Sequence, residues 1–199
     1  LVRLGVEDIV LIDHDRFEPS NRTRVYGSFS SSERGKWGSL HSRRPMKVEV
    51  VTEHLRRINP RVRITAIPQS VVLREAAARL LGRDVILLCT DDHWGRSIVN
   101  QIAYQYLIPT INMGVRIASD EGRITGASGS IDVLRPDKPC LWCSGFLRAE
   151  RVTGESTPGP QRLALQAEGY LEGLETPTPS VVSINTAVSG MAVTLFLQL

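Results

Sequence analysis

Short apolar segments alternate with amphipathic segments along this chain, and this alternation limits the fold more than any other feature. The segment EDIVLID at 7–13 is a continuous apolar run of the kind that is buried on both faces of a parallel sheet. Strands that alternate with helices form a parallel sheet wrapped by those helices. The sequence therefore predicts an α/β protein with a Rossmann-like, mostly parallel sheet, in which strands are expected at 7–13, 61–67, 84–90 and 108–114 and helices at 45–58, 74–82 and 95–107.

The pattern changes after residue 114. The Gly-punctuated segment 122–136 predicts antiparallel strands added to the C-terminal edge of the sheet. Residues 145–178 are rich in Gly, Pro, Glu and Thr, which is typical of a long mobile crossover segment. A last helix is expected from about Ser180. The stretch from Thr176 to Leu199 is uncharged but holds too many Ser, Thr, Asn and Gln residues for lipid, so we interpret this helix as buried.

The beginning of the sequence, LVRLG, has the pattern of a last helical turn closed by Gly5 in the C-cap position. A strand follows directly. We interpret residues 1–199 as a single domain that lacks its first strand. A Gly-rich phosphate loop, which would lie about 20 residues before the acidic end of the second strand, would fall before Leu1.

Composition and charge exclude several classes of protein. With 199 residues and 42% apolar residues, the chain can bury one sizeable core. Its net charge of +3 is spread along the sequence and only 6% of its residues are aromatic, which argues against a nucleic-acid surface. Three cysteines do not form a disulfide framework, and we expect the reducing cytoplasm as its compartment.

Two acidic residues follow strands of the expected sheet. Ligands of open parallel sheets bind beyond the carboxyl ends of the strands, where Asp13 and Asp91 are expected to lie. In this architecture, an acidic residue at the end of the second strand accepts hydrogen bonds from nucleotide ribose hydroxyls. A simpler interpretation remains open for both, because Asp is common in turns and at helix N-termini.

Four motifs carry a family resemblance. In order, these are LIDHDRFEPSNRTR (11–24), PMKVEVVTEHLRRINP (45–60), DVILLCTDDHWGR (84–96) and CLWC (140–143). Together they resemble the adenylating domain of the ThiF/MoeB superfamily, which includes the ubiquitin-activating enzymes. The resemblance implies an ATP-dependent adenylyltransferase. In this family a carboxylate, usually the C-terminal glycine of a ubiquitin-like or sulfur-carrier protein, attacks the α-phosphate of ATP, and acyl-AMP and pyrophosphate are formed.

The resemblance also implies roles for residues of the first two motifs. Asp13 is similar to the ribose-binding aspartate of the family. Asn21 and Arg24 match the SN-x-x-R pattern, in which the arginine neutralises phosphate oxygens and the asparagine orients them. Lys47 matches the lysine that stabilises the leaving pyrophosphate. As alternatives, Asn21 could form an Asx turn, and Arg24 and Lys47 could be solvated surface charges.

Residues of the last two motifs are expected to serve metals and phosphates. Asp91 matches the aspartate that holds Mg²⁺ through oxygen ligation, and Arg96 is expected to be a further cation near the nucleotide. Cys140 and Cys143 have the spacing of half a zinc site, and zinc requires a second pair beyond Leu199. A pair of plain thiols is the alternative. The family also implies a homodimer, and a small carboxylate is an alternative substrate.

Departures from the family pattern leave other functions open. Residues 145–178 contain no cysteine, so we expect adenylation without a thioester on this chain. Arg22 replaces a usual Leu and Asp92 a usual Asn, which keeps open a catalytically degenerate subunit that binds a nucleotide or a partner. A nicotinamide-dependent oxidoreductase would need an acid-base pair such as Tyr and Lys, and we find none near the sheet edge.

Overall fold

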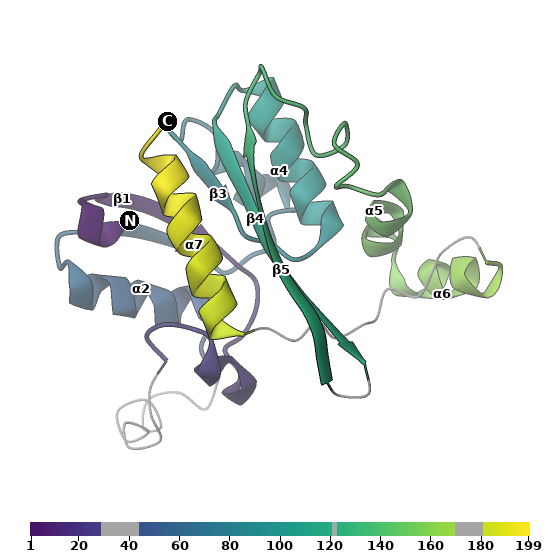
Figure 1. Ribbon diagram of the computed structural model, residues 1–199, viewed down its shortest axis with the longest axis horizontal. Coiled ribbons are helices and arrows are strands. Elements are labelled where there is room, and N and C mark those ends of the chain that lie inside the picture. The colour runs from purple at the N-terminus through teal and green to yellow at the C-terminus, as the bar shows by residue number, and fades with distance from the viewer. Residues whose placement is uncertain (29–43, 121–122, 170–180) are drawn as a thin grey trace. The chain divides into compact units, whose positions relative to one another are not determined.

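The computed structural model describes residues 1–28, 44–120, 123–169 and 181–199 (Figure 1). These residues form two compact units, Leu1–Arg79 and Leu80–Leu199, and each is described by itself. No helix of the described ranges is long and apolar enough to cross a membrane.

The first unit contains a parallel pair of strands. Strands β1 (Asp8–Ile12) and β2 (Arg63–Ile67) pair from Asp8 opposite Arg63 to Ile12 opposite Ile67. The helix α2 (Lys47–Ile58) packs against β2 and buries Val48, Val50 and Thr52. The remaining helices of this unit are the 3₁₀ helices η1 (Val2–Leu4) and η2 (Pro19–Thr23) and the α-helix α3 (Arg74–Ala78).

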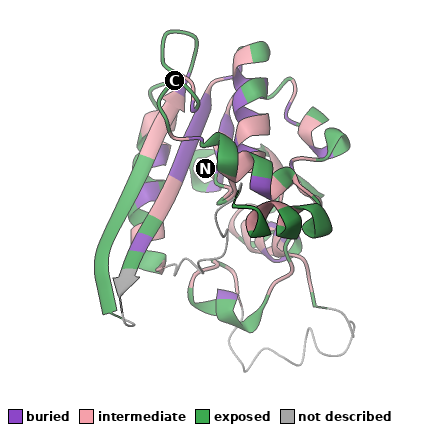
Figure 2. Cartoon of the chain, turned by 90° about the vertical axis from the view of Figure 1, so that its right-hand side faces the viewer, coloured by how far each residue is buried: buried purple, intermediate pink, exposed green. Residues whose placement is uncertain are grey.

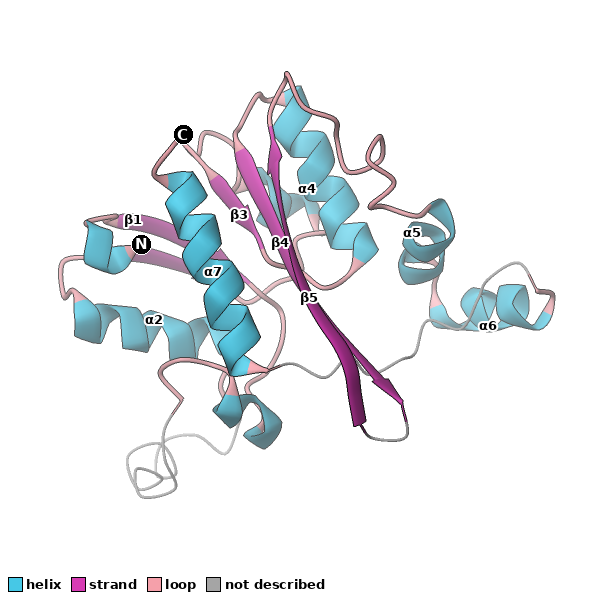
Figure 3. Ribbon diagram, viewed as in Figure 1, coloured by secondary structure: helices cyan, strands magenta, loops and turns pink. Residues whose placement is uncertain are grey.

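The second unit contains a mixed sheet in the order β3–β4–β5, shown in magenta in Figure 3. The strands are β3 (Ile86–Leu88), β4 (Thr110–Asp120) and β5 (Arg123–Leu134). β3 and β4 are parallel, whereas β4 and β5 form a long antiparallel hairpin with an irregularity between Ala118 and Ser119. The helices are α4 (His93–Gln105), α5 (Ala149–Ser156), α6 (Gly159–Ala167) and α7 (Val182–Phe196).

Two helices cover the two faces of this mixed sheet. Ile111 and Met113 of β4 pack with Val188 and Ala192 of α7, and burial concentrates along the middle of the sheet (Figure 2). Asn112, between them in the alternating strand, faces α4 instead, where it meets Arg96. Asn112 and its partner Arg96 therefore lie on the side of the sheet that α4 covers.

The structure confirms the expected fold class. Both parallel pairings and the added antiparallel strand are present, and each predicted strand and helix has its counterpart within a few residues. The predicted turn at LVRLG is present as η1, and Gly5 adopts φ 90° at its C-cap.

Some expectations differ from the structure. The segment 122–136 forms one strand rather than several, because β4 extends beyond Gly114 and offers it a partner along its length. Residues 145–178 contain α5 and α6, and positions 170–178 lie outside the described residues. The expectation of a buried last helix holds for one side of α7 only, since Met191 is 64% exposed.

Candidate active site

Asp13 directly follows β1 and is held in a tight turn. Its backbone N–H donates to Ile67 O across 3.2 Å, and its side-chain Oδ1 accepts the N–H of Asp15 across 2.8 Å. Burial raises the pKa of the Asp13 carboxyl, the negative charge of Asp15 adds to this, and the Asp15 N–H and Lys47 oppose it. One oxygen of Asp13 thus serves the turn, as the simpler interpretation of this residue predicts. The carboxylate also lies at the carboxyl end of β1, as the sequence predicts.

Lys47 is brought to the same turn from 32 residues away. Its Nζ lies 2.6 Å from Asp15 Oδ2, and its backbone N–H donates to Asp15 O across 2.9 Å. An antiparallel bridge between Arg16 and Met46 joins the two segments beside it. Lys47 is the first residue of α2, so the start of that helix is fixed against the loop that follows β1.

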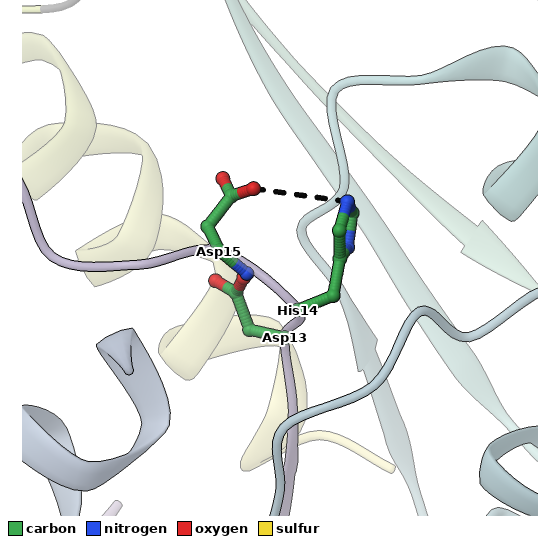
Figure 4. Close-up of side chains that lie close together, drawn as sticks. All are labelled: Asp13, His14 and Asp15. Atoms are coloured by element: carbon green, nitrogen blue, oxygen red, sulfur yellow. Dashed lines mark hydrogen bonds and ion pairs between the residues drawn. The ribbon is translucent and has the colours of Figure 1, made fainter. Parts of the chain in front are cut away.

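His14 completes a cluster that sequence reasoning left out. The side-chain atoms of Asp13, His14 and Asp15 that can ligate a metal ion lie within 4.8 Å of one another. His14 Nε2 is 3.7 Å from Asp15 Oδ1 (Figure 4). From the sequence, the four histidines share no spacing and are interpreted as structural or exposed residues. The signal that could have revealed this cluster is the spacing D-H-D itself, directly after an apolar strand.

Asn21 and Arg24 are engaged within their own turn. Asn21 is 5% exposed, and its Oδ1 accepts the N–H of Glu18 across 2.9 Å, which is the bond that starts η2. Arg24 Nη1 donates to Ser20 O across 3.3 Å. No hydrogen bond within the described part of the chain joins either residue to Asp13 or Lys47, so their phosphate roles stay predictions.

In the second unit, Asp91 and Asp92 follow β3 and have different environments. Asp91 is exposed, whereas the Asp92 side chain caps α4 by accepting the N–H of Gly95. An exposed carboxylate at the end of a strand suits Mg²⁺, which prefers oxygen ligands and keeps several waters. Asp91 therefore fits the predicted magnesium ligand, while Asp92 has a structural partner.

Arg96 is buried on the inner side of α4. Its Nη1 donates to Asn112 Oδ1 across 2.6 Å, its Nη2 donates to Met113 O across 3.3 Å, and its guanidinium lies 4.9 Å from the ring centre of Phe146. Asn112 in turn donates from Nδ2 to Asp132 Oδ2 across 3.0 Å. Arg96 thus links α4 to the sheet, and its expected contact with a nucleotide stays a prediction.

Sequence reasoning missed Asn112 and Asp132. They stand opposite each other in the β4–β5 register, and Asn112 is fully buried. A polar residue between Ile111 and Met113 in a strand was the available signal, because alternation assigns it to the opposite face.

Cys140 and Cys143 lie together in the loop after β5. Their Sγ atoms are 3.2 Å apart, the N–H of Cys143 points to Cys140 Sγ, and neither forms a disulfide. Burial opposes ionisation of Cys140, but hydrogen bonds, chiefly from Cys143, lower its pKa overall. Two thiolates suit zinc, although zinc takes four ligands, and no third candidate ligand joins them within the described ranges.

Cys89 follows β3 directly. The residue is exposed overall, but burial raises the pKa of its thiol, and its Sγ donates to Leu87 O across 3.7 Å. The strand β3 ends at Leu88, one residue earlier, so this thiol is no longer inside the sheet.

The fold and these charges define a Rossmann-like α/β protein, in which Asp13 follows β1 of the first unit and Asp91 follows β3 of the second. More narrowly, the chain belongs to the ThiF family, whose model matches residues 1–199. The resemblance in the sequence motifs is thereby confirmed.

Individual relatives agree with this membership. The chain is 27% identical over 178 residues to the molybdopterin-synthase adenylyltransferase of Escherichia coli (strain K12), which covers 88% of the chain and 64% of the relative. It is 27% identical over 145 residues to the adenylyltransferase and sulfurtransferase UBA4 of Saccharomyces cerevisiae (strain ATCC 204508 / S288c), which covers 72% of the chain and 29% of the relative.

Solved structures show the same fold. E. coli MccB with MccA-N7isoASN matches at a TM-score of 0.63 and 18% identity, over 97% of this chain and 49% of MccB. E. coli MccB with ATP matches at 0.61 and 17%, over 97% of this chain and 48% of MccB. The chain thus spans about half the length of MccB and less than two thirds of its curated relatives.

Proposed function

We propose that this chain forms the adenylating part of a ThiF/MoeB-like adenylyltransferase. It joins the AMP of ATP to a carboxylate, most suitably the C-terminal glycine of a ubiquitin-like or sulfur-carrier protein, and releases pyrophosphate. The observation that carries the proposal is the position of Lys47, whose Nζ is held at the carboxyl end of β1 in the turn that begins with Asp13. Two relatives with the name adenylyltransferase support it, as does the likeness to MccB with ATP.

In this reaction, an anion attacks a polyanion, so the site must supply positive charge. Asp13 accepts hydrogen bonds from the ribose hydroxyls, and Lys47 stabilises charge on the leaving pyrophosphate. Arg24 and Asn21 serve the phosphates, and Asp91 holds Mg²⁺. The metal, when bound, neutralises phosphate charge.

The activated acyl group is passed on without a thioester on this chain. Adenylation itself forms the bond between the substrate carboxylate oxygen and the α-phosphorus and breaks the bond to the leaving pyrophosphate. Residues 145–178 offer no cysteine that could accept the acyl group afterwards. A cysteine downstream of these residues or a separate partner molecule is the proposed acceptor.

The protein is further proposed to be a cytoplasmic homodimer with zinc. Cys140 and Cys143 supply two thiolates, and two ligands from elsewhere complete the tetrahedral site. Metal analysis of the wild type and of Cys140→Ser tests this, since the variant should lose bound zinc. Light scattering tests the dimer, and a monomer at micromolar concentration would argue against it.

A second candidate function is a degenerate subunit that binds a nucleotide or a partner without chemistry. The observation that favours it is that the side chains of Asn21 and Arg96 form hydrogen bonds with other residues of the fold. The replacements at Arg22 and Asp92 point the same way.

Isotope exchange between pyrophosphate and ATP separates the two functions. The protein in its natural length is assayed with a pool of proteins ending in Gly-Gly and of small carboxylic acids. Exchange that depends on one member of the pool, and is lost in Lys47→Ala, supports the adenylyltransferase and identifies the substrate. ATP binding without exchange on any member would support the degenerate subunit instead.

A further inference from the structure

The first turn of α4 is capped by two carboxylates from different parts of the chain. The Asp92 side chain accepts the N–H of Gly95, as a local cap does. Glu155 belongs to α5 and lies 61 residues after Trp94 in the sequence. Its Oε2 accepts the N–H of Trp94 across 2.7 Å. The first four N–H groups of a helix have no partner inside the helix, so this long-range bond satisfies a group that a local cap leaves open.

The pKa of the Glu155 carboxyl is raised overall, and its neighbours act on it in both directions. Burial raises the pKa of its carboxyl, the Trp94 N–H lowers it, Asp92 raises it, and the His93 N–H and Arg151 lower it. The carboxylate is thus half-buried and is stabilised by backbone N–H groups at the positive end of the helix dipole.

A second contact ties the same segment to α4. The ring of Phe146, three residues before α5, lies under the Arg96 guanidinium at 4.9 Å and beside the His93 ring at 6.3 Å. The segment from Phe146 to Glu155 therefore contacts α4 at two points, the backbone N–H of Trp94 and the side chains of His93 and Arg96. α5 lies next to α4 in Figure 1, and its Gly154 is buried.

We propose that Glu155 is a positioning residue for adenylation, which holds α5 on the first turn of α4 and so fixes the direction of Asp91. The inference rests on the function proposed above. Asp91 immediately precedes the capping Asp92, so its backbone is joined directly to the first turn of α4. A loosened turn would weaken the use of Mg²⁺.

Three variants test the proposal. Glu155→Ala removes the acceptor, and Glu155→Gln keeps an oxygen acceptor without the charge. Glu150→Ala is the matched control, because Glu150 is an exposed carboxylate on the same helix.

The first measurement is hydrogen exchange, which needs no activity. The Trp94 amide should exchange about tenfold faster in Glu155→Ala, less so in Glu155→Gln, and at the wild-type rate in Glu150→Ala. An unchanged rate in Glu155→Ala would overturn the proposal.

The second measurement is the Mg²⁺ concentration that gives half-maximal pyrophosphate exchange. It should rise about tenfold in Glu155→Ala and be largely restored in Glu155→Gln, with the KM for ATP at saturating Mg²⁺ nearly unchanged. A faster Trp94 amide with unchanged Mg²⁺ dependence would show a purely structural role and refute the inference.

If the wild type shows no exchange reaction, the proposed function fails, but the inference can still be decided. The Mg²⁺ dependence of ATP binding, followed by calorimetry, then takes the place of the activity. The same shift is expected, and its absence in Glu155→Ala would contradict the positioning role.

Discussion

Lys47 Nζ lies 2.6 Å from Asp15 Oδ2, and the backbones of the same two residues are joined by an N–H···O bond of 2.9 Å. The Asp15 side chain is 52% exposed, so the ion pair contributes at most about 1 kcal/mol to stability. Its effect is instead on position, because the lysine is fixed at the carboxyl end of β1 by two bonds to one residue.

Replacing Lys47 should therefore affect catalysis more than stability. Lys47→Ala is expected to lower the rate of pyrophosphate exchange on the order of 100-fold to 1,000-fold, since a preorganised charge at the leaving group is lost. Lys138→Ala is the control, because Lys138 is an exposed lysine in a loop. A Lys47→Ala protein that retains the full rate of pyrophosphate exchange would show that Lys47 takes no part in the reaction.

Neutralising Asp15 should release Lys47 toward phosphate. In Asp15→Asn the attraction that competes with a bound nucleotide is removed, so the Kd for ATP should fall by up to about fivefold. Fluorescence titration of wild type and variant measures this at low salt, where the effect is largest. Weaker binding in the variant would instead mean that Asp15 is needed to place the lysine.

Asp91 and Asp92 form a natural pair of test and control. Asp91→Asn should raise the Mg²⁺ requirement of the exchange reaction at least about tenfold, because one carboxylate ligand becomes a weaker amide ligand. Asp92→Asn keeps a good capping residue and should leave the Mg²⁺ requirement nearly unchanged. Equal effects in both variants would contradict the assignment of the metal to Asp91.

The sequence predicted the elements of the fold and the position of strand-end charges. Periodicity reports which faces are buried, and it correctly placed Asp13 after β1 and Lys47 at the start of α2. It does not report which distant residues meet. The pairing of Lys47 with Asp15 depends on the bridge between Arg16 and Met46, which no local pattern reveals.

The burial of Arg96 could not be predicted from local sequence either. A helical arginine near the end of a strand is expected to be an exposed cation, since most arginines are exposed. Its burial results from three partners, Asn112, Met113 and Phe146, which lie up to 50 residues away in the chain. Only the packing of β4 and of the loop after β5 on α4 determines that environment.

Arg96→Lys is accordingly expected to destabilise the second unit. Arg96 reaches Asn112 and Met113 from two nitrogens of one planar group that also lies over Phe146, and the single ammonium of lysine cannot reproduce this geometry, so the buried amide oxygen of Asn112 is expected to lose its partner. The free energy of unfolding should fall by about 2 to 4 kcal/mol. Chemical denaturation measures it, with Arg116→Lys at an exposed position of β4 as the control. Equal stability of both variants would contradict the structural role of Arg96.

Asp13 should make nucleotide binding depend on pH. Burial raises its pKa, so the folded protein keeps the proton at pH values at which the unfolded chain has released it. The contribution of the Asp13 carboxyl to the stability of the folded protein is therefore present at low pH and is lost as the pH rises through the raised pKa. Nucleotide binding has the opposite pH dependence and is stronger at high pH, because the ionised carboxylate is the form that accepts hydrogen bonds from both ribose hydroxyls.

The affinity for ATP should thus weaken as the pH falls toward the raised pKa of Asp13, and Asp13→Asn should lack this component. Dividing the Kd of the variant by that of the wild type at each pH cancels the ionisation of ATP itself. This ratio should be on the order of tenfold or more near neutral pH, because hydrogen bonds to a charged acceptor are lost, and should fall toward one in acid. Calorimetry across the acidic range measures it, and a ratio that does not change with pH would show that the ribose is not held by Asp13.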